Sequence, residues 1–350
     1  MNIFDSVNVK AMKSFYEADT NAAPFVGEMW FPVEKQMGLD ITMVKGKQGV
    51  GVALVDAGFD TNVLYRNRRT FSEIQFSLPF QKEAYKINEK VRQELLKVQS
   101  SGEEYKKAEI LKVFNDVEEL LKGAAITREK MRMDILATGG ILINTNGENK
   151  NYDYGFNAAT QQKTVTVKWD DATADVLTDF HDMIDAATEA NNDVKPAYAL
   201  CRTSLLRKLV KNNNIIAYFG SQISPVLPTL DRVKEFLENE LDIKFILNDK
   251  KYIPAREGVS GTPVNFYPES RISLVQEANL GKTIFGTTPE EADLLGGQAT
   301  SATTQIVDTG VAVTMWKTTD PVSVSTKVSQ VVLPSCENIE GIYIGVVLAE

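Results

Sequence analysis

The chain has 350 residues, long enough for one large domain or two of ordinary size, and its 43% hydrophobic and 24% charged residues are typical of a folded soluble protein. Its 38 lysines and arginines against 47 aspartates and glutamates give a net charge of −9, which argues against tight nucleic-acid binding because that binding needs a basic surface. The sequence has no apolar run long enough for a membrane span and no signal-peptide pattern at its start, and its two cysteines favour a reducing cytosol.

The first part of the chain is expected to need a partner surface. Aromatic residues are frequent before residue 35 but follow no helix or strand period, which is typical of a segment that packs against another surface. Residues 39–80 alternate short β-like pieces with glycines, and residues 65–69 form a basic tip. We interpret 39–80 as an extended two-stranded excursion. An isolated hairpin is marginally stable in water, so the excursion should contact another surface.

A long helical strut is predicted next. Residues 83–99 carry apolar residues at spacing four and predict a first helix, which Ser100-Ser101-Gly102 would break. A second apolar stripe runs from about residue 103 to residue 138, which is about 50 Å of helix, and Gly139-Gly140 should end it. The residues expected to pack from this stripe, which Arg128 interrupts, are Ile110, Phe114, Val117, Leu121, Ala124, Met131 and Ile135.

The rest of the chain predicts a mixed α/β body followed by a β-rich tail. The expected elements of the body are strands at 141–143 and 164–169 with Asn146-Gly147 between them, a helix capped by Asp170 or Asp171 with a stripe from Val176 to Ala187, strands at 197–201, 243–247 and 272–275, and helices at 204–211 and 229–241. The tail, residues 311–348, is expected to return as strands.

No part of the sequence assembles a catalytic, cofactor or metal site. Gly46–Gly51 lacks the spacing of a phosphate-binding loop and is followed by strand residues, so a β-turn is the better interpretation. Four aspartates share one side of the helix after Trp169, but no calcium-loop pattern accompanies them. We interpret the first two, Asp171 and Asp175, as residues that favour the positive helix N-terminus. The other two, Asp179 and Asp182, are interpreted as a solvated face.

The residue types that most often carry chemistry also have ordinary interpretations here. The single histidine, His181, fits a helix surface, Cys201 fits a strand core, and Cys336 follows a turn. A basic tip between two aromatic residues is one pattern that binds single-stranded nucleic acid. Because the chain is acidic, we prefer these arginines as partners for an acidic patch on another subunit; they are Arg66, Arg68 and Arg69.

Several local sequences, taken in order, resemble a known family. They are the strut end TREKMRMDILATGG at 127–140, YDYG at 152–155 leading to KWDD at 168–171, and IFGTTPEE at 284–291. With the order of arm, β excursion, strut, α/β body and β tail, they resemble the major capsid proteins of tailed phages, specifically the phage lambda capsid protein E family. The resemblance covers nearly the whole chain, and the order of the motifs carries it.

The resemblance implies an α+β fold of the Hong Kong 97 phage capsid type. The implied parts are an N-terminal arm at 1–38, an E-loop at 39–80 that lies over a neighbouring subunit, a peripheral domain at 81–169 with its spine helix at 103–138, an α/β axial domain at 170–310, and returning strands of the peripheral domain at 311–350.

The implied function is that of a major capsid (head) protein without enzymatic activity or cofactors. Pentamers and hexamers would form an icosahedral shell around packaged double-stranded DNA, assembled as a procapsid in the host bacterial cytoplasm and retained in the virion. The expected partners are further copies, a separate scaffolding protein, the portal and a decoration protein, with no membrane. Two alternatives stay open: an encapsulin-like shell around a cargo enzyme, and a metabolic enzyme built on the α/β body.

Overall fold

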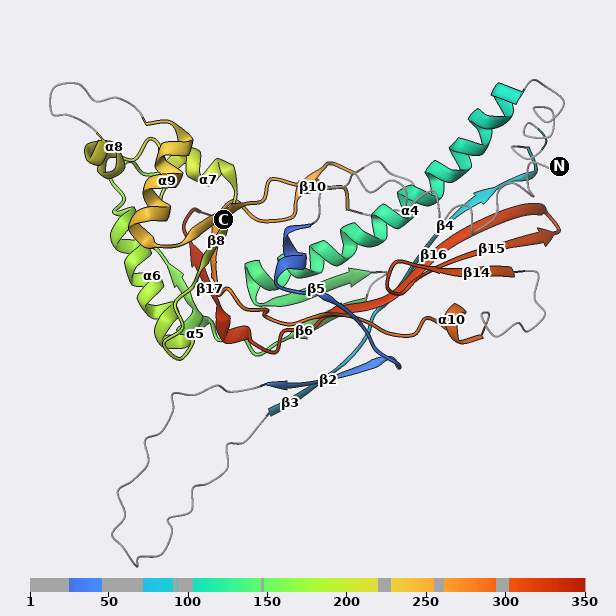
Figure 1. The fold of residues 1–350 in the computed structure, drawn as a ribbon, viewed down its shortest axis with the longest axis horizontal. Coiled ribbons are helices and arrows are strands. Elements are labelled where there is room, and N and C mark those ends of the chain that lie inside the picture. The colour runs from blue at the N-terminus through green and yellow to red at the C-terminus, as the bar shows by residue number, and fades with distance from the viewer. Residues whose placement is uncertain are drawn as a thin grey trace, which may run out of the picture. The chain divides into compact units, whose positions relative to one another are not determined.

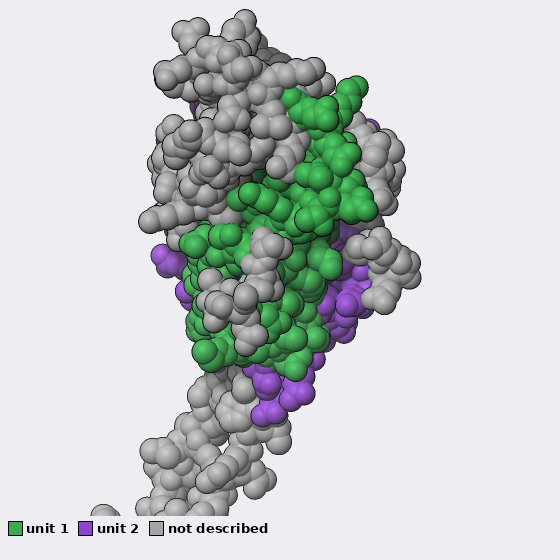
Figure 2. All heavy atoms as spheres, turned by 90° about the vertical axis from the view of Figure 1, so that its right-hand side faces the viewer, with its two compact units in different colours: residues 1–41, 76–132, 282–335 green, residues 42–75, 133–281, 336–350 purple. Residues whose placement is uncertain are grey.

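The computed structural model describes residues 25–45, 72–90, 93, 103–145, 148–219, 228–254, 261–293 and 302–349. The chain divides into two compact units, which Figure 2 shows in different colours. Each unit is built from separated stretches of the sequence. Unit 1 contains residues 1–41, 76–132 and 282–335, and unit 2 contains residues 42–75, 133–281 and 336–350.

Unit 1 is built on a six-stranded sheet (Figure 1). The strand order is β1-β13-β16-β15-β14, and β4 also pairs with β16, so β16 has three strand partners. β1 and β13 pair in parallel, and the other neighbours are antiparallel. The strands are β1 Val33–Lys35, β4 Phe80–Ile87, β13 Thr283–Phe285, β14 Ala302–Val307, β15 Val311–Thr319 and β16 Val322–Pro334.

Strand β4 corrects the prediction of a helix at 83–99. Its residues pair with β16 in continuous register, from Ile87 opposite Val324 to Phe80 opposite Val331. A spacing of four is an even number, so it repeats on one face of a strand as well as on one face of a helix. Residues 80–87 therefore form a strand and not a helix because they pair with β16. Residues 89, 90 and 93 are helical, and 94–99 lie outside the described residues.

The predicted strut is helix α4, Glu103–Thr138, with 36 residues. It ends where Gly139 adopts a φ of +75°, and the Gly139 N–H donates to the Ile135 carbonyl at 2.8 Å. A Cβ on Gly139 would lie 2.2 Å from the Phe156 ring, so glycine is required both by conformation and by space. The boundary between the units falls inside this helix, after Arg132.

A hairpin follows α4 in the sequence, and only its first strand was predicted. Strands β5, Gly140–Thr145, and β6, Glu148–Asp153, pair antiparallel. The sequence predicted the first strand but placed its partner at 164–169, because β6 is too polar to stand out (ENKNYD). Asn146-Gly147, expected in the connection, lies outside the described residues. The strand expected at 164–169 is displaced: β7 covers Gln162–Thr164.

Unit 2 contains a five-stranded sheet in the order β7-β17-β12-β8-β9. β8 and β9 pair in parallel and β12 is antiparallel to both β8 and β17. The sheet strands after β7 are β8 Tyr198–Cys201, β9 Lys244–Leu247, β12 Arg271–Val275 and β17 Ile342–Val346. The helices of this unit after α4 are α5 Ala158–Gln161, α6 Val176–Ala190, α7 Thr203–Leu209, α8 Asn213–Phe219 and α9 Leu230–Leu241.

The core of unit 2 lies around α6. Phe180 is fully buried, with its ring centre 4.7 Å from that of Trp169 and 5.8 Å from that of Phe245. The helix is capped by Asp175, which accepts a hydrogen bond from the Thr178 N–H. The predicted caps, Asp170 and Asp171, were wrong because the chain makes a further turn before the helix begins.

Strand pairing divides the chain differently from the expected boundaries at 170–310 and 311–350. β13 and β14 belong to the sheet of unit 1, whereas β17 pairs with β12 in unit 2 instead of joining the other tail strands. Antiparallel pairing of β17 with β12 places the chain end in the α/β body. The remaining elements are the short helices η1 Val26–Met29, α10 Pro289–Asp293 and η2 Ile339–Gly341, and the strands β2 Asp40–Lys45, β3 Ser72–Ser77, β10 Lys251–Tyr252 and β11 Val264–Asn265.

Candidate assembly site

The β excursion is described at its base. β2 and β3 pair with each other as a two-stranded sheet, as the sequence predicted for an extended hairpin. At the foot of this hairpin the Leu78 N–H donates to the Leu39 carbonyl at 2.8 Å. The basic tip lies outside the described residues, so the role of its three arginines stays a prediction; they are Arg66, Arg68 and Arg69.

Burial can be given for only some of the spine-helix residues expected to pack. Val117, Leu121, Met131 and Ile135 are all less than 4% exposed. Ile110 and Phe114 lie within α4, but their side chains are outside the described residues. On the sheet side of unit 1, the Tyr85 hydroxyl of β4 donates to Glu119 at 3.1 Å, and this bond links the strand to α4.

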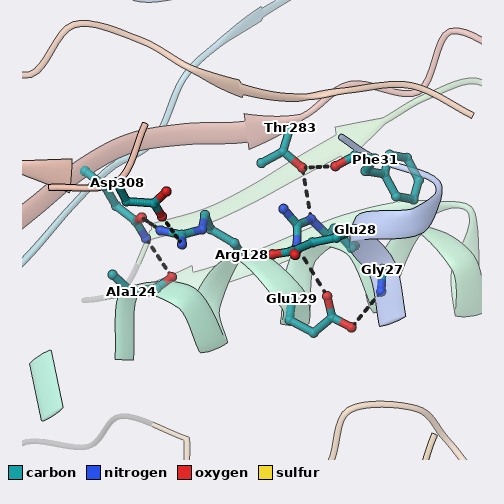
Figure 3. Close-up of polar contacts among 10 residues, drawn as sticks. Gly27, Glu28, Phe31, Ala124, Arg128, Glu129, Thr283 and Asp308 are labelled. Carbon is teal, nitrogen blue, oxygen red and sulfur yellow. Dashed lines mark hydrogen bonds and ion pairs between the residues drawn. The ribbon is translucent and has the colours of Figure 1, made fainter. Parts of the chain in front are cut away.

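Charged residues are buried on α4 next to these apolar ones. Arg128 interrupts the predicted stripe, yet it is only 5% exposed. Its guanidinium donates to Asp308 Oδ2 at 2.9 Å (Figure 3) and to Gln330 Oε1 at 3.0 Å. It also lies over the Phe285 ring, 5.2 Å from the ring centre. The Gln330 amide in turn donates to the Ala124 carbonyl at 3.1 Å, which ties β16 to the helix backbone.

The next residue, Glu129, and Arg132 one turn further along hold the segment before β1. Glu129 Oε1 accepts from the Gly27 N–H at 2.9 Å, and Arg132 Nη1 lies 3.4 Å from Glu129 Oε2 and 3.2 Å from Glu28 Oε1 (Figure 3). Arg132 Nε donates to Thr283 Oγ1 at 2.9 Å, and that hydroxyl donates to the Phe31 carbonyl at 2.9 Å. The network therefore joins η1, α4 and β13 within unit 1.

The electrostatics of this network are unbalanced. Burial raises the pKa of Glu129, and the Gly27 N–H and the Arg132 charge offset that effect only in part. Arg132 is fully buried, and within the described residues its Nη2 has no hydrogen-bond partner. Glu28, its other anionic partner, is 41% exposed at the side chain. A buried cation is thus matched by one fully buried and one half-exposed carboxylate.

A second set of charges lies beside α10. Lys327 of β16 pairs with the buried Glu290, and Lys35 of β1 contacts both Glu291, at 2.5 Å, and the Gly286 carbonyl, at 3.2 Å. Burial acts to raise the pKa of Glu290, but the hydrogen bond and charge of Lys327 outweigh it and hold that pKa below its usual range. These contacts fasten α10 to the sheet.

The remaining candidate residues have structural surroundings. His181 is exposed, Cys336 is buried, and burial raises the pKa of the Cys201 thiol to about 12, which removes its nucleophilic form at neutral pH. Asp179 accepts from the Trp169 indole N–H at 3.0 Å, and Lys163 pairs with Asp179 and Asp182. Across the described ranges, no cluster of three or more His, Cys, Asp or Glu side chains is arranged to hold a metal ion.

In unit 1, the part of α4 up to Arg132 packs on the six-stranded sheet. The contacts described for this unit hold its elements to one another. None of the helices in the described part has the length and apolar character of a membrane span.

Comparison with solved structures places the fold. A prophage capsid protein of E. coli CFT073 matches over 98% of this chain and 99% of its own, with a TM-score of 0.59 at 12% identity. A phage-related protein from Bordetella bronchiseptica RB50 matches over 96% of both chains, with a TM-score of 0.53 at 11% identity. The fold is the α+β Hong Kong 97 phage capsid type, as predicted.

Sequence comparison then gives the family. The profile of the phage major capsid protein E family matches residues 8–347, and the chain belongs to that family. No curated protein sequence matches it significantly. The predicted family and its class, a phage or prophage major capsid protein, are confirmed.

Proposed function

We propose that this chain is the head protein of a tailed bacteriophage or prophage and that it assembles into pentamers and hexamers of an icosahedral shell. The observation that supports this most is the family match over 8–347, nearly the full chain. The contacts of the described residues support the same role, since the buried charges described on α4, Arg128, Glu129 and Arg132, bond to other elements of unit 1.

The shell encloses packaged double-stranded DNA without sequence-specific binding. The net charge of −9 supports this part, because an acidic wall does not hold a polyanion tightly. Assembly as a procapsid on a separate scaffolding protein in the bacterial cytoplasm, a portal and a decoration protein complete the proposal. The chain carries no catalytic activity in this role and has no membrane partner.

The parts of the subunit keep the roles that the family resemblance suggested. Residues 1–38 form an arm, 39–80 an E-loop over a neighbouring subunit, and α4 the spine. An E-loop needs a neighbour because a two-stranded sheet such as β2–β3 is marginally stable alone. The three tip arginines, Arg66, Arg68 and Arg69, then meet acidic groups of the next copy.

Sedimentation and negative-stain microscopy of the purified protein test the proposal. Capsomers, shells, sheets or tubes are expected, either spontaneously or when the scaffolding protein is added. A compact monomer over a wide concentration range, with no assembly on scaffold addition, would contradict it. A cargo enzyme inside purified shells, in place of DNA-packaging partners, would assign the chain to the nanocompartment class.

A further inference from the structure

The segment at residues 25–31 in unit 1 is held by two kinds of contact. Trp30 and Phe31 are fully buried and provide apolar adhesion. The polar contacts come from Glu129 and Arg132 of α4, which reach the Gly27 N–H and the Glu28 carboxylate, as Figure 3 shows for the labelled partners.

These polar contacts can form at only one position of residues 25–31 along α4. A Cβ at residue 27 would lie 2.7 Å from Glu129 Oε2, 2.8 Å from Arg132 Cβ and 2.9 Å from Arg132 Cδ. Val26 and Glu28 flank Gly27, so a shift by one residue in either direction would bring a side chain into this space. Apolar contacts have no direction and tolerate such shifts more readily.

Adhesion does not explain why these charges are buried. Arg132 and Glu129 are at most 1% exposed, Arg132 Nη2 has no partner among the described residues, and burial raises the pKa of Glu129. Removing two charges from water costs free energy that a buried ion pair recovers only with complete hydrogen bonding. An apolar pair of similar size would hold the segment at least as well, so the charges fit a role in positional specificity.

We propose that Glu129 and Arg132 form a registration device for the N-terminal segment: they select the one position of residues 25–31 on α4 that leaves Gly27 against the pair. The position of Phe25, from which the arm precedes the described chain, follows from that selection. The effect on shells rests on the proposed function, whereas the effect on the subunit does not.

The test replaces the pair by apolar residues of similar size in the full chain, Glu129→Leu with Arg132→Met. Hydrogen exchange of the Gly27 amide in unassembled subunits is the direct measurement, because that amide donates to Glu129. We expect exchange at least tenfold faster than in the parent, a melting temperature no lower than that of Arg132→Met alone, and shells of mixed size or shape. The Gln36 amide, which donates to the Phe285 carbonyl, should stay protected and report that β1 remains folded.

Two further variants separate registration from general damage. Glu129→Gln keeps an oxygen for the Gly27 N–H and should leave the exchange of this amide within about threefold of the parent. Arg128→Met removes another buried arginine of the same helix, one that bonds Asp308 and Gln330, and should leave Gly27 exchange unchanged.

Three outcomes would overturn the proposal. Gly27 exchange in the double variant within threefold of the parent would show that the pair does not select the position. A double variant that melts below both single variants would show that the pair acts as a stabiliser. Equal acceleration of Gly27 exchange in Arg128→Met would show a general loosening of α4. If the parent forms no shells at all, the proposed function fails while the exchange results still decide this inference.

Discussion

Leu121→Ala tests whether α4 packs into a core at the centre of unit 1. The Leu121 side chain is 3% exposed and lies between Val117, at 2%, and the start of the buried charged stretch at Arg128. Truncating a buried leucine to alanine removes its transfer free energy and leaves a cavity, at a cost of about 2–5 kcal/mol. We take about 3 kcal/mol as the expected loss in the free energy of unfolding.

The size of the melting shift also reports which part of the chain unfolds together. With an unfolding entropy of about 2.1 cal/mol/K per residue, a loss of about 3 kcal/mol lowers the melting temperature by about 4 °C if all 350 residues unfold as one. The shift rises to about 10 °C if unit 1, with about 150 residues, unfolds by itself.

The assay is calorimetry on unassembled subunits, with particle yield measured in parallel. Lys122→Ala is the matched control, because its side chain is 53% exposed and pairs with Glu118 one turn away. A helix pair at this spacing contributes at most about 1 kcal/mol, so this variant should melt within about 3 °C of the parent. If Leu121→Ala melts and assembles like Lys122→Ala, the helix does not face a core there and our account of unit 1 is wrong.

Further variants examine the same helix and the hairpin tip. Phe114→Ala should lower the free energy of unfolding by about 3–5 kcal/mol if the buried stripe continues toward the start of the helix. An unchanged melting temperature would show that the stripe ends at Val117. Gly123→Ala should raise the free energy of unfolding by about 0.5–1 kcal/mol, because among the described residues an added Cβ would meet no atom within 4 Å beyond the helix's own backbone; a lower melting temperature would contradict this. Replacing Arg66, Arg68 and Arg69 together by alanine should leave the subunit melt unchanged and make assembly weaker and less salt-sensitive. Unchanged assembly across a salt series would refute that role. The raised pKa of Glu129 means that the folded state holds this proton more tightly, so parent stability should fall as pH rises from about 4.3 to the raised value, and Glu129→Gln should lack this fall in urea titrations. The same dependence of stability on pH in the parent and in Glu129→Gln would refute this prediction.

The elements with clear start or stop signals in the local sequence were predictable. Helix α4 has the predicted bounds, and Gly139 adopts the left-handed conformation directly after it. β8, α7, α9, β9 and β12 also lie within a residue or two of the predicted ranges, since the strands are short apolar runs and the helices carry apolar residues at helical spacing.

The errors occur where pairing over a long distance in sequence decides the structure. β4 reads as a charged helix by itself and becomes a strand because β16, more than 230 residues later, offers it a full register. β6 carries no strand signal of its own and is a strand because it pairs with β5 over its whole length. The partner of β17 cannot be read from its own apolar run, which suits either sheet equally well.

The charge network was visible in the sequence only as an irregularity. Arg128 interrupts an apolar stripe, and Arg132 follows it one turn later, which indicates that something polar faces them. What faces them comes from residues 27–31, 283, 308 and 330, and no periodicity in the sequence connects these positions to α4. Such partners can be assigned only once the fold is known.

Polar contacts on the spine helix fit what a shell demands of its subunit. Every copy in a closed shell has to present the same surfaces to its neighbours, since a self-assembling interface repeats with the symmetry. Apolar packing gives α4 adhesion to its sheet but little resistance to sliding, whereas the bonds of Arg128 to Gln330 and of Arg132 to Thr283 each accept one alignment. The helix therefore buries charge at a cost in stability and gains one fixed alignment with two different strands of the same sheet.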